Sequence, residues 1–300
     1  MNKLKLVFTI ILLVTAVFGQ AGNSGLKRGN STRTLITEKD TLIDPQSNGY
    51  KLVWADEFNK NGPVDTSVWR FEKGFVRNKE YQWYQSENVR CENGYLIIEA
   101  KKTHFPNPTY NKADTNWKRQ REFVDFTSGS INTAGKKSWK YGRFVMRARI
   151  NTAMGLWPAF WTLGNQGQWP ANGEIDIMEF YRHYLLANIA VEAEPHKALW
   201  YSNRKDISTF KDKNWSKKFH VWRMDWDKDG IALYVDDILM NQVYMKDLYN
   251  RDKSETYPFQ QPQYILLDLA IGGMQGGDPA KTSFPARFEV DYVRVYQKSE

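Results

Sequence analysis

Three carboxylic acids stand close together near the middle of the 300-residue chain, at Glu174, Asp176 and Glu179. On an α-helix, at about 100° per residue, the two glutamates would point about 140° apart and could not share a substrate. On a regular strand Glu174 and Asp176 share one face, while Glu179 lies on the other face with the intervening isoleucines. One extra residue near Met178, a β-bulge, would return Glu179 to the first face. We therefore expect a bulged strand that presents three acids on one open face.

Two such acids on one face suit the hydrolysis of a glycosidic bond, in which one carboxylate attacks the sugar and the other protonates the leaving oxygen. A retaining mechanism requires the two carboxyl groups to be about 5 to 5.5 Å apart. Because three like charges in a partly desolvated cleft cannot all stay ionised, one acid should have a raised pKa and donate a proton. An acidic, solvated strand edge would explain the same spacing. The aromatic run at 156–161 favours the sugar site, because indole faces beside carboxylates suit the binding of a sugar ring.

The same region resembles a known family signature. The segment from Gly155 to Gly164, followed by Trp169-Pro170 and by Gly173 to Glu179, is similar to the signature of glycoside hydrolase family 16 in its bulged, laminarinase-like form. Further family-like segments extend from about Tyr50 to Tyr296. The resemblance implies an all-β fold, a β-jelly-roll sandwich of two antiparallel sheets with a substrate cleft on the concave face. It also implies retaining, endo-acting hydrolysis of β-linked polysaccharides.

Carried over position by position, the resemblance assigns a role to each acid. Glu174 is expected to be the nucleophile and Glu179 the general acid/base. Asp176 is expected to orient Glu174 and to modulate its charge. No cofactor is expected for catalysis. Some relatives bind a structural calcium away from the cleft, and the positions that match their ligands are Glu57, Gly94 and Asp291.

Five further residues are candidates for substrate binding: Asn78, Trp157, Trp161, Tyr181 and His183. In relatives an asparagine like Asn78 hydrogen-bonds sugar hydroxyls, although a turn residue is the plainer interpretation. Trp157 and Trp161 are expected to stack on sugars beside the scissile bond. One of the two belongs to the core instead if a bulge separates them. Tyr181 and His183 follow the acids closely, and His183 has an exposed surface position as its alternative.

The substrate is left open by one departure from the family pattern. Many laminarinase-like relatives carry a histidine on the strand after the acids, facing the acid/base, whereas this chain has Asn188 or Ala190 there. We expect a β-1,3- or mixed-linkage β-1,3/1,4-glucan as the substrate. The first alternative is an endo-β-galactosidase acting on algal galactan or on poly-N-acetyllactosamine and mucin-type glycans. A carbohydrate-binding jelly roll without catalysis is the second.

The N-terminal segment has the pattern of an export signal. Residues 1–21 combine Lys3 and Lys5 with an apolar stretch at 6–18 and small residues behind it, which is typical of a signal peptide. Residues 22–48 are polar and read as a linker or flexible arm, and 49–300 form the predicted catalytic domain. The single cysteine, Cys91, lies far from the leader and excludes an internal disulfide. We expect a secreted or periplasmic protein with no membrane attachment after signal cleavage.

Strands that could position the acids are predicted from alternating apolar residues and from turn signals. They cover 50–58, 95–100, 128–133, 141–150, 185–190, 220–226, 231–235, 264–271 and 288–296. Residues 103–126 are predicted to form a long loop at the rim of the cleft. In the strand at 141–150, Arg147 or Arg149 could neutralise cleft carboxylates, but an exposed strand face is the role expected of at least two of the arginines in this strand.

Charge and composition give few further constraints. The net charge of +8 is compatible with an anionic polysaccharide, and is also that of an ordinary solvated surface. The sequence shows neither a basic helix nor a nucleic-acid motif, so nucleic acid is not an expected partner. The histidines lack metal-ligand spacing. A polysaccharide is the expected partner of a monomeric protein.

Overall fold

The computed structural model describes residues 44–252 and 255–299. The predicted signal peptide at 1–21 and the predicted arm up to residue 43 lie outside the described residues. Within the described part, no helix is both long and apolar enough to cross a membrane.

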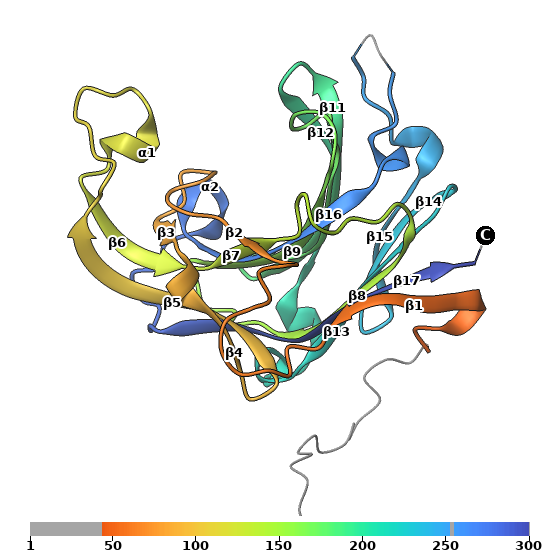
Figure 1. The fold of residues 1–300 in the computed structure, drawn as a ribbon, viewed down its shortest axis with the longest axis horizontal. Coiled ribbons are helices and arrows are strands. Elements are labelled where there is room, and N and C mark those ends of the chain that lie inside the picture. Colours follow the sequence, from red (N-terminus) through yellow and green to blue (C-terminus); the bar gives the residue numbers. More distant parts are fainter. Residues whose placement is uncertain (1–43, 253–254, 300) are drawn as a thin grey trace, which may run out of the picture. The chain divides into compact units, whose positions relative to one another are not determined.

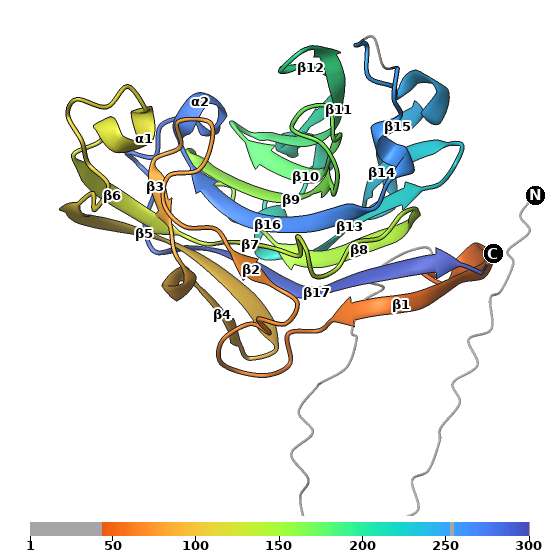
Figure 2. The same ribbon diagram turned by 45° about the horizontal axis from the view of Figure 1, so that its top comes forward.

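Two β-sheets make up the fold (Figures 1 and 2). The first sheet has ten strands, in the order β15-β14-β13-β8-β17-β5-β6-β3, with β1 paired to β17 and β4 paired to β5. Its strands are β1 (Tyr50–Asp56), β3 (Gln82–Tyr84), β4 (Val89–Glu92), β5 (Tyr95–Pro106), β6 (Phe123–Ser128), β8 (Gly142–Arg149), β13 (His220–Trp226), β14 (Gly230–Val235), β15 (Ile238–Tyr244) and β17 (Ala286–Lys298).

The second sheet has seven strands, in the order β12-β11-β10-β9-β16-β7-β2. Its strands are β2 (Arg70–Phe71), β7 (Ser130–Asn132), β9 (Leu156–Gly164), β10 (Glu174–Tyr181), β11 (Tyr184–Glu194), β12 (Lys197–Asp206) and β16 (Gln263–Ile271). Every strand pair within it is antiparallel.

Helices are few and short in the described chain. Two α-helical turns, α1 (Trp117–Gln120) and α2 (Gly273–Gly276), lie in connections. The 3-10 turns are Ser47–Gly49, Ser86–Asn88, Ile207–Phe210, Trp215–Lys217, Met245–Asp247 and Pro258–Gln260. The predicted all-β sandwich of two sheets is therefore confirmed. The strand pairs of the described chain are antiparallel, with the exception of β3 and β6, which pair in parallel.

The core lies between the two sheets. Ile175, Ile177 and Met178 of β10 point into it, where they join the buried Phe160 of β9 and Met224 of β13 in one apolar cluster. Burial of this apolar surface is the main force that holds the sheets together. The opposite face of the seven-stranded sheet is left to form a cleft.

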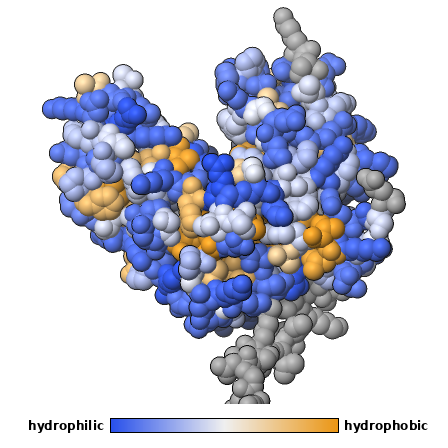
Figure 3. Space-filling view, in the orientation of Figure 1, coloured by the Kyte–Doolittle hydropathy of each residue, from blue (hydrophilic) through white to orange (hydrophobic). Residues whose placement is uncertain are grey.

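The cleft is visible as a hollow in the surface. β11 and β12 rise on one side of β9 and β16, and β6 with α1 rises on the other (Figure 1). The space-filling view shows the surface hollowed between these raised parts (Figure 3). A cavity of about 1160 Å³ lies there, and its lining residues come mainly from the seven-stranded sheet. The predicted concave cleft is thus present.

One predicted element has other bounds, and one of the two roles left open for the arginines of β8 is excluded. The long loop expected at 103–126 is shorter, because β5 continues to Pro106 and β6 begins at Phe123. The arginines of β8 do not reach the cleft, because β8 belongs to the ten-stranded sheet. Arg147 pairs with Asp291, and Arg149 pairs with Glu289.

Candidate active site

The predicted bulge is present in β10 and has the expected effect. Asp176 of β10 pairs with Trp161 of β9, and Glu179 of β10 pairs with Ala159 of β9. Between these two pairs β9 has one residue, Phe160, whereas β10 has two, Ile177 and Met178, and both turn into the core. Glu179 therefore returns to the face of the other acids. All three acids line the cleft cavity.

Side-chain hydrogen bonds hold the acids in place. The Nε1 atom of Trp157 donates to Oε1 of Glu179 at 2.7 Å. The Nδ2 atom of Asn188 donates to Oε2 of Glu179 at 2.8 Å and to Oδ2 of Asp176 at 3.2 Å. Asp176 also shares hydrogen bonds with both glutamates. Its carboxyl group therefore bridges the two glutamates.

Burial changes the protonation of all three acids. Desolvation raises the pKa of Glu179 to about 7, with a further contribution from the charge of Glu174. Desolvation, followed by the charges of both glutamates, raises the pKa of Asp176 well above its usual range. The pKa of Glu174 is also raised by burial, but the indole N–H of Trp169 donates to this carboxylate and opposes the shift. The arrangement can therefore keep a proton on Glu179 near neutral pH.

One cation that lines the cleft, Arg77, was not predicted from the sequence. Arg77 lines the cavity and pairs with Glu72, and its Nη1 atom lies 3.9 Å from Oδ1 of Asp268. Its guanidinium carbon lies 5.0 Å from the ring centroid of Trp161. Asp268 also accepts hydrogen bonds from Nε1 of Trp161 at 2.8 Å and from the hydroxyl of Tyr84 at 2.9 Å. The only sequence signal for Arg77 was its place directly before Asn78.

Four of the five predicted substrate-binding residues line the cavity: Asn78, Trp157, Trp161 and Tyr181. The two tryptophans share the cleft face, but each is only 7% exposed, and their indole N–H groups bind Glu179 and Asp268. Their indole N–H groups therefore hold two acidic side chains in position at the floor of the cleft.

Asn78 sits on a loop that other elements clamp in place. Its backbone is left-handed, with φ of 51°, and its Nδ2 atom donates to Oε1 of Glu80 at 3.2 Å. The guanidinium of Arg121 donates to the carbonyl oxygens of Lys79 and Glu80. Its carbon also lies 4.7 Å from the ring centroid of Phe75. The connection between β5 and β6 thus contacts the Asn78 loop through Arg121, which fixes this loop.

The structure does not place His183 in the cleft. Arg182 and His183 are the two loop residues of the β10–β11 hairpin, since Tyr181 pairs with Tyr184. Both loop residues have positive φ, 47° and 76°, as a tight hairpin turn requires. The side chain of His183 is exposed and is not among the residues that line the cavity.

Two exposed tryptophans at the cleft were not predicted as ligands. Trp169 and Trp200 line the cavity and are 44% and 42% exposed. Ala190 of β11 pairs with both Glu174 and Trp200, so Trp200 lies in the same cross-strand row as Glu174. A sequence signal existed for Trp169, which stands five residues before Glu174. No local signal indicated that β12 would border the cleft.

The residues predicted to bind calcium do not fit a calcium site. Both carboxylate oxygens of Glu57 accept hydrogen bonds from Arg294, at 2.7 and 2.9 Å. Oδ2 of Asp291 accepts a hydrogen bond from Arg147 at 2.9 Å. An arginine side chain thus binds each acid in the place that a calcium ion would need. The described residues also contain no group of three or more His, Cys, Asp or Glu side chains arranged to hold a metal ion.

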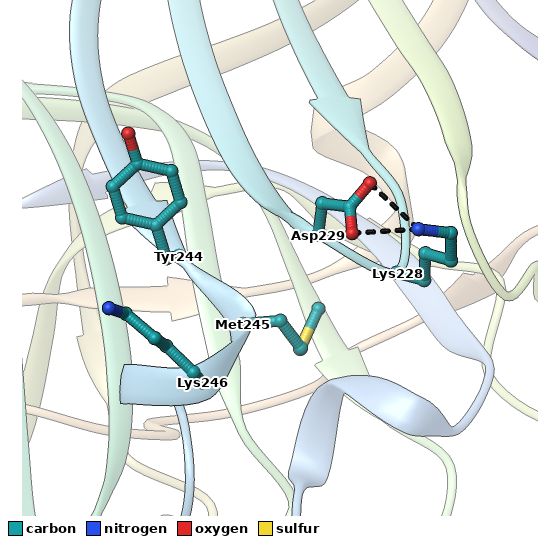
Figure 4. Close-up of a pocket in the computed structure, with 5 residues that line it drawn as sticks. All are labelled: Lys228, Asp229, Tyr244, Met245 and Lys246. Carbon is teal, nitrogen blue, oxygen red and sulfur yellow. Dashed lines mark hydrogen bonds and ion pairs between the residues drawn. The ribbon is translucent and has the colours of Figure 1, made fainter.

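A second hollow of about 400 Å³ lies on the ten-stranded sheet (Figure 4). It is lined by Lys228, Asp229, Tyr244, Met245 and Lys246. Its one acid, Asp229, is bound by the neighbouring Lys228, at 2.8 and 3.0 Å. A single neutralised acid cannot supply the two carboxyl roles of glycoside hydrolysis, so the large cleft is the better candidate.

Comparisons with known proteins agree with this geometry. The model of glycosyl hydrolases family 16 matches residues 77–294. Beta-glucanase of Rhodothermus marinus is 35% identical over 266 residues, which cover 83% of this chain and 85% of that protein. Glucan endo-1,3-beta-glucosidase A1 of Niallia circulans is 33% identical over 280 residues, but these cover 86% of this chain and only 39% of that longer protein.

A solved structure from work on endo-acting O-glycanases, which prominent members of the human gut microbiota express to initiate mucin breakdown, is also similar. It superposes with a TM-score of 0.77 at 32% sequence identity, and the match covers 88% of this chain and 95% of that chain.

Proposed function

The chain belongs to glycosyl hydrolases family 16 and is a glycoside hydrolase, and from this premise we propose that it is a secreted, retaining endo-β-glycanase. Its substrate in this proposal is a β-1,3- or mixed-linkage β-1,3/1,4-glucan. One observation carries the proposal: the bulge in β10 brings Glu174 and Glu179 into one cleft, on either side of Asp176.

In the first step, the carboxylate of Glu174 attacks the anomeric carbon, and the bond from that carbon to the leaving oxygen breaks. Glu179 gives its proton to the leaving oxygen, which leaves as a hydroxyl group. In the second step Glu179, now a carboxylate, takes a proton from water, and the water oxygen displaces Glu174 from the sugar. The hydrogen bonds from Trp157 and Asn188 to Glu179 stabilise the carboxylate that exists between the two steps.

Asp176 serves both steps without touching the sugar. Its raised pKa favours a protonated carboxyl group, which can donate a hydrogen bond to Glu174 while Glu174 is ionised. When Glu174 becomes the neutral ester of the intermediate, the loss of its charge removes one cause of the raised pKa of Asp176. The pKa of Asp176 thus changes with the charge on Glu174.

The glucan substrate is supported by the two glucan hydrolases that resemble this chain over most of its length. Trp169 and Trp200 offer exposed indole faces inside the cleft, and we assign them the stacking role that was first expected of Trp157 and Trp161. Trp169 donates a hydrogen bond to Glu174, and Trp200 lies in the same cross-strand row two strands away. In this proposal the sugar-binding surface therefore extends from the nucleophile towards β12.

A second candidate substrate is a mucin-type or poly-N-acetyllactosamine glycan cut by an endo-β-galactosidase activity. Two observations favour it. The similar structure at a TM-score of 0.77 comes from work on endo-acting O-glycanases. Asn188 also stands where a histidine was expected beside the acid/base, so the sugar at this position meets a different side chain.

The test is product release from laminarin, barley-type mixed-linkage glucan, agarose, porphyran and mucin glycans, with the first-formed anomer followed by proton NMR. We expect internal cleavage of the glucans and a β-configured product. Cleavage only of galactans or mucin glycans would replace the proposed substrate. An α-configured product would refute the retaining mechanism.

The residue roles are tested with two variants. Glu174→Gln should release no product from any of these substrates. Glu179→Gln should lose about 10²- to 10⁴-fold on glucan but retain activity on an aryl β-glycoside, whose phenol leaves without a proton. Glu194→Gln, at an exposed glutamate, is the matched control and should behave as the wild type. Equal glucan hydrolysis by Glu174→Gln and the wild type would exclude Glu174 as the nucleophile.

A further inference from the structure

Strand β12 carries a cation into the cleft. Arg204 of this strand lines the cavity and is exposed. Leu186 of β11 pairs with both Glu179 and Arg204, so Arg204 lies in the cross-strand row of the proposed acid/base. Neighbouring strands are about 4.8 Å apart, so β12 lies about 10 Å from β10 along this row. Arg204 is therefore placed beside a sugar that flanks the cleavage point.

The guanidinium of Arg204 has no polar partner within the described part of the chain, where its contact is with an aromatic ring. Every other arginine within residues 44–252 and 255–299 donates a side-chain hydrogen bond to another residue. Asp206, two residues further along β12, could have neutralised Arg204. Its carboxylate instead accepts a hydrogen bond from the backbone N–H of Ser208. The donors of Arg204 are thus left for a ligand.

The free guanidinium is nevertheless held in place. Its carbon lies 4.6 Å from the ring centroid of Tyr184. Tyr184 pairs with Tyr181 at the base of the tight β10–β11 hairpin, which fixes the position of the ring. A guanidinium that stacks on an aromatic face keeps the N–H groups at its edge available, and less side-chain entropy is lost when they bind an acceptor.

The wall of the cleft formed by β11 and β12 differs in charge from the floor. The residues that these two strands contribute to the lining are Leu186, Asn188, Trp200, Ser202, Asn203 and Arg204. Arg204 is the one charged side chain among them. The acids that line the cavity come from β10, from β16 and from the connection between β2 and β3. An anionic group that reaches β12 therefore meets a cation and is kept apart from the acids.

We propose that Arg204 selects glycans in which a sugar beside the cleavage point carries an anionic group, either a carboxylate or a sulfate ester. This inference rests on the proposed function and narrows its substrate class. The two N–H edges of a guanidinium can bind a pair of anionic oxygens, and such charge-assisted hydrogen bonds are stronger than those to a neutral hydroxyl. The indole of Trp200 on the same strand supports the ring that bears the group.

The experiment measures binding to Glu174→Gln, in which turnover is prevented. The probes are β-1,3-glucan oligosaccharides and two anionic series, in which one glucose at each position in turn is replaced by glucuronic acid or by 6-sulfated glucose. At one position the anionic group should lower Kd by about 10-fold relative to the neutral parent. Glu174→Gln combined with Arg204→Gln should lose this gain and should bind the neutral parent within about 2-fold as before. The series that shows the gain identifies the anionic group.

Two further variants, in the same Glu174→Gln background, test the chemistry of the contact. Arg204→Lys should keep part of the gain, because it retains the charge and loses the forked donors. Lys205→Gln is the matched control, because it removes a cation one residue away that does not line the cavity and lies 5.3 Å from the ring centroid of Phe210. It should keep the whole gain. Raising the salt concentration should reduce the gain, since the site is open to solvent.

Two outcomes would overturn the inference. In the first, no position of the anionic group improves binding to Glu174→Gln. In the second, Arg204→Gln weakens the binding of neutral and anionic oligosaccharides by the same factor, which would show that Arg204 only hydrogen-bonds sugar hydroxyls. Unfolding temperatures equal to that of Glu174→Gln would confirm that the variants are folded.

These results separate the inference from the function on which it rests. If the wild type hydrolyses glucans and the gain is absent, only the inference is wrong. If the wild type hydrolyses none of the glycans and the gain depends on Arg204, the proposed hydrolysis is wrong and the anionic preference stands as a binding property. If the wild type cleaves only galactans, the same comparison of neutral and sulfated galactan oligosaccharides decides the inference.

Discussion

At the scale of single residues, the proton on Glu179 determines how activity varies with pH. Burial and the charge of Glu174 raise the pKa of Glu179 to about 7, although Trp157 and Asn188 donate to its carboxylate. The acid must be protonated when the leaving oxygen departs. We therefore expect kcat/KM to fall about tenfold per pH unit above pH 7, measured on a glucan substrate from pH 4 to 9.

Trp157→Phe is the variant that tests this explanation, because it keeps an aromatic ring and removes the Nε1 donor. With one donor fewer to stabilise the carboxylate, the pKa of Glu179 should rise and the basic limb should move to higher pH. A limb that stays in place would show that another group titrates. A basic limb centred below pH 5 in the wild type would contradict the raised pKa altogether.

The roles of residues could be predicted only where the signal was local. The spacing of the three acids indicated a bulged strand, and this is present. Trp200 was missed because strand pairing brings it into the row of Glu174, which no short sequence pattern specifies. Arg77 was missed because it lies in the connection between β2 and β3 and meets Asp268 of β16 only in the folded chain. His183 was misplaced for the opposite reason: it is close to the acids in sequence, but a hairpin turn directs it away from the cleft.

At the scale of elements, the bulge in β10 sets the distance between the two glutamates. Deletion of Met178 would leave Ile177 opposite Phe160 and Glu179 opposite Ala159, which is a regular antiparallel register. The three acids would stay on the cleft face. We expect this deletion variant to fold and to keep measurable hydrolysis, but to lose about 2–5 kcal/mol of stability with the buried methionine side chain. Chemical denaturation and product release would measure the two effects.

Deletion of Ile175 is the matched control. It makes Glu174 and Asp176 neighbours, so one of these acids must point into the apolar core. This variant should be inactive and severely destabilised. If both deletions have the same effect, the side-chain periodicity of β10 does not determine the site.

Strands were predictable where alternation and turn signals agree, as in the hairpin of β13 and β14. The membership of a strand in one sheet or the other was not. β8 alternates arginine with apolar residues, which fits either sheet, and its arginines in fact pair with acids of the ten-stranded sheet. The connection at 103–126 was predicted too long because polar side chains continue along exposed parts of β5 and β6.

At the scale of the whole molecule, the charge is distributed unevenly. The chain carries a net charge of +8, yet the cleft is lined by six acids and three arginines among the described residues. The acids are Glu72, Glu80, Glu174, Asp176, Glu179 and Asp268. Burial raises the pKa of Asp268 to about 6 and that of Glu80 to about 7. Concentrating buried acids in one cleft therefore reduces the stability of the fold when they ionise.

Glu80 allows this cost to be measured without touching the proposed catalytic acids. Its pKa is about 7 in the folded chain against 4.5 for the unperturbed group, and the largest cause is burial. The folded state thus holds the proton more tightly than the unfolded state does. The resulting stabilisation is fully present below pH 4.5 and is lost as the pH rises through 7. Between pH 5.5 and 8.5, Glu80 alone should account for a loss of about 2 kcal/mol in the free energy of unfolding.

Glu80→Gln should remove that part of the pH dependence, so denaturant unfolding at the two pH values should differ less for the variant than for the wild type. The readout is this difference and not the absolute stability. The new amide turns one acceptor into a donor that faces Asn78 or Gln82, both of which donate to the Glu80 carboxylate. That mismatch lowers the free energy of unfolding at both pH values, so it cancels in the difference between them. Glu194→Gln, at an exposed site, is the control and should show the same difference between the two pH values as the wild type. If Glu80→Gln also shows the wild-type difference, Glu80 is not protonated in the folded protein at pH 5.5.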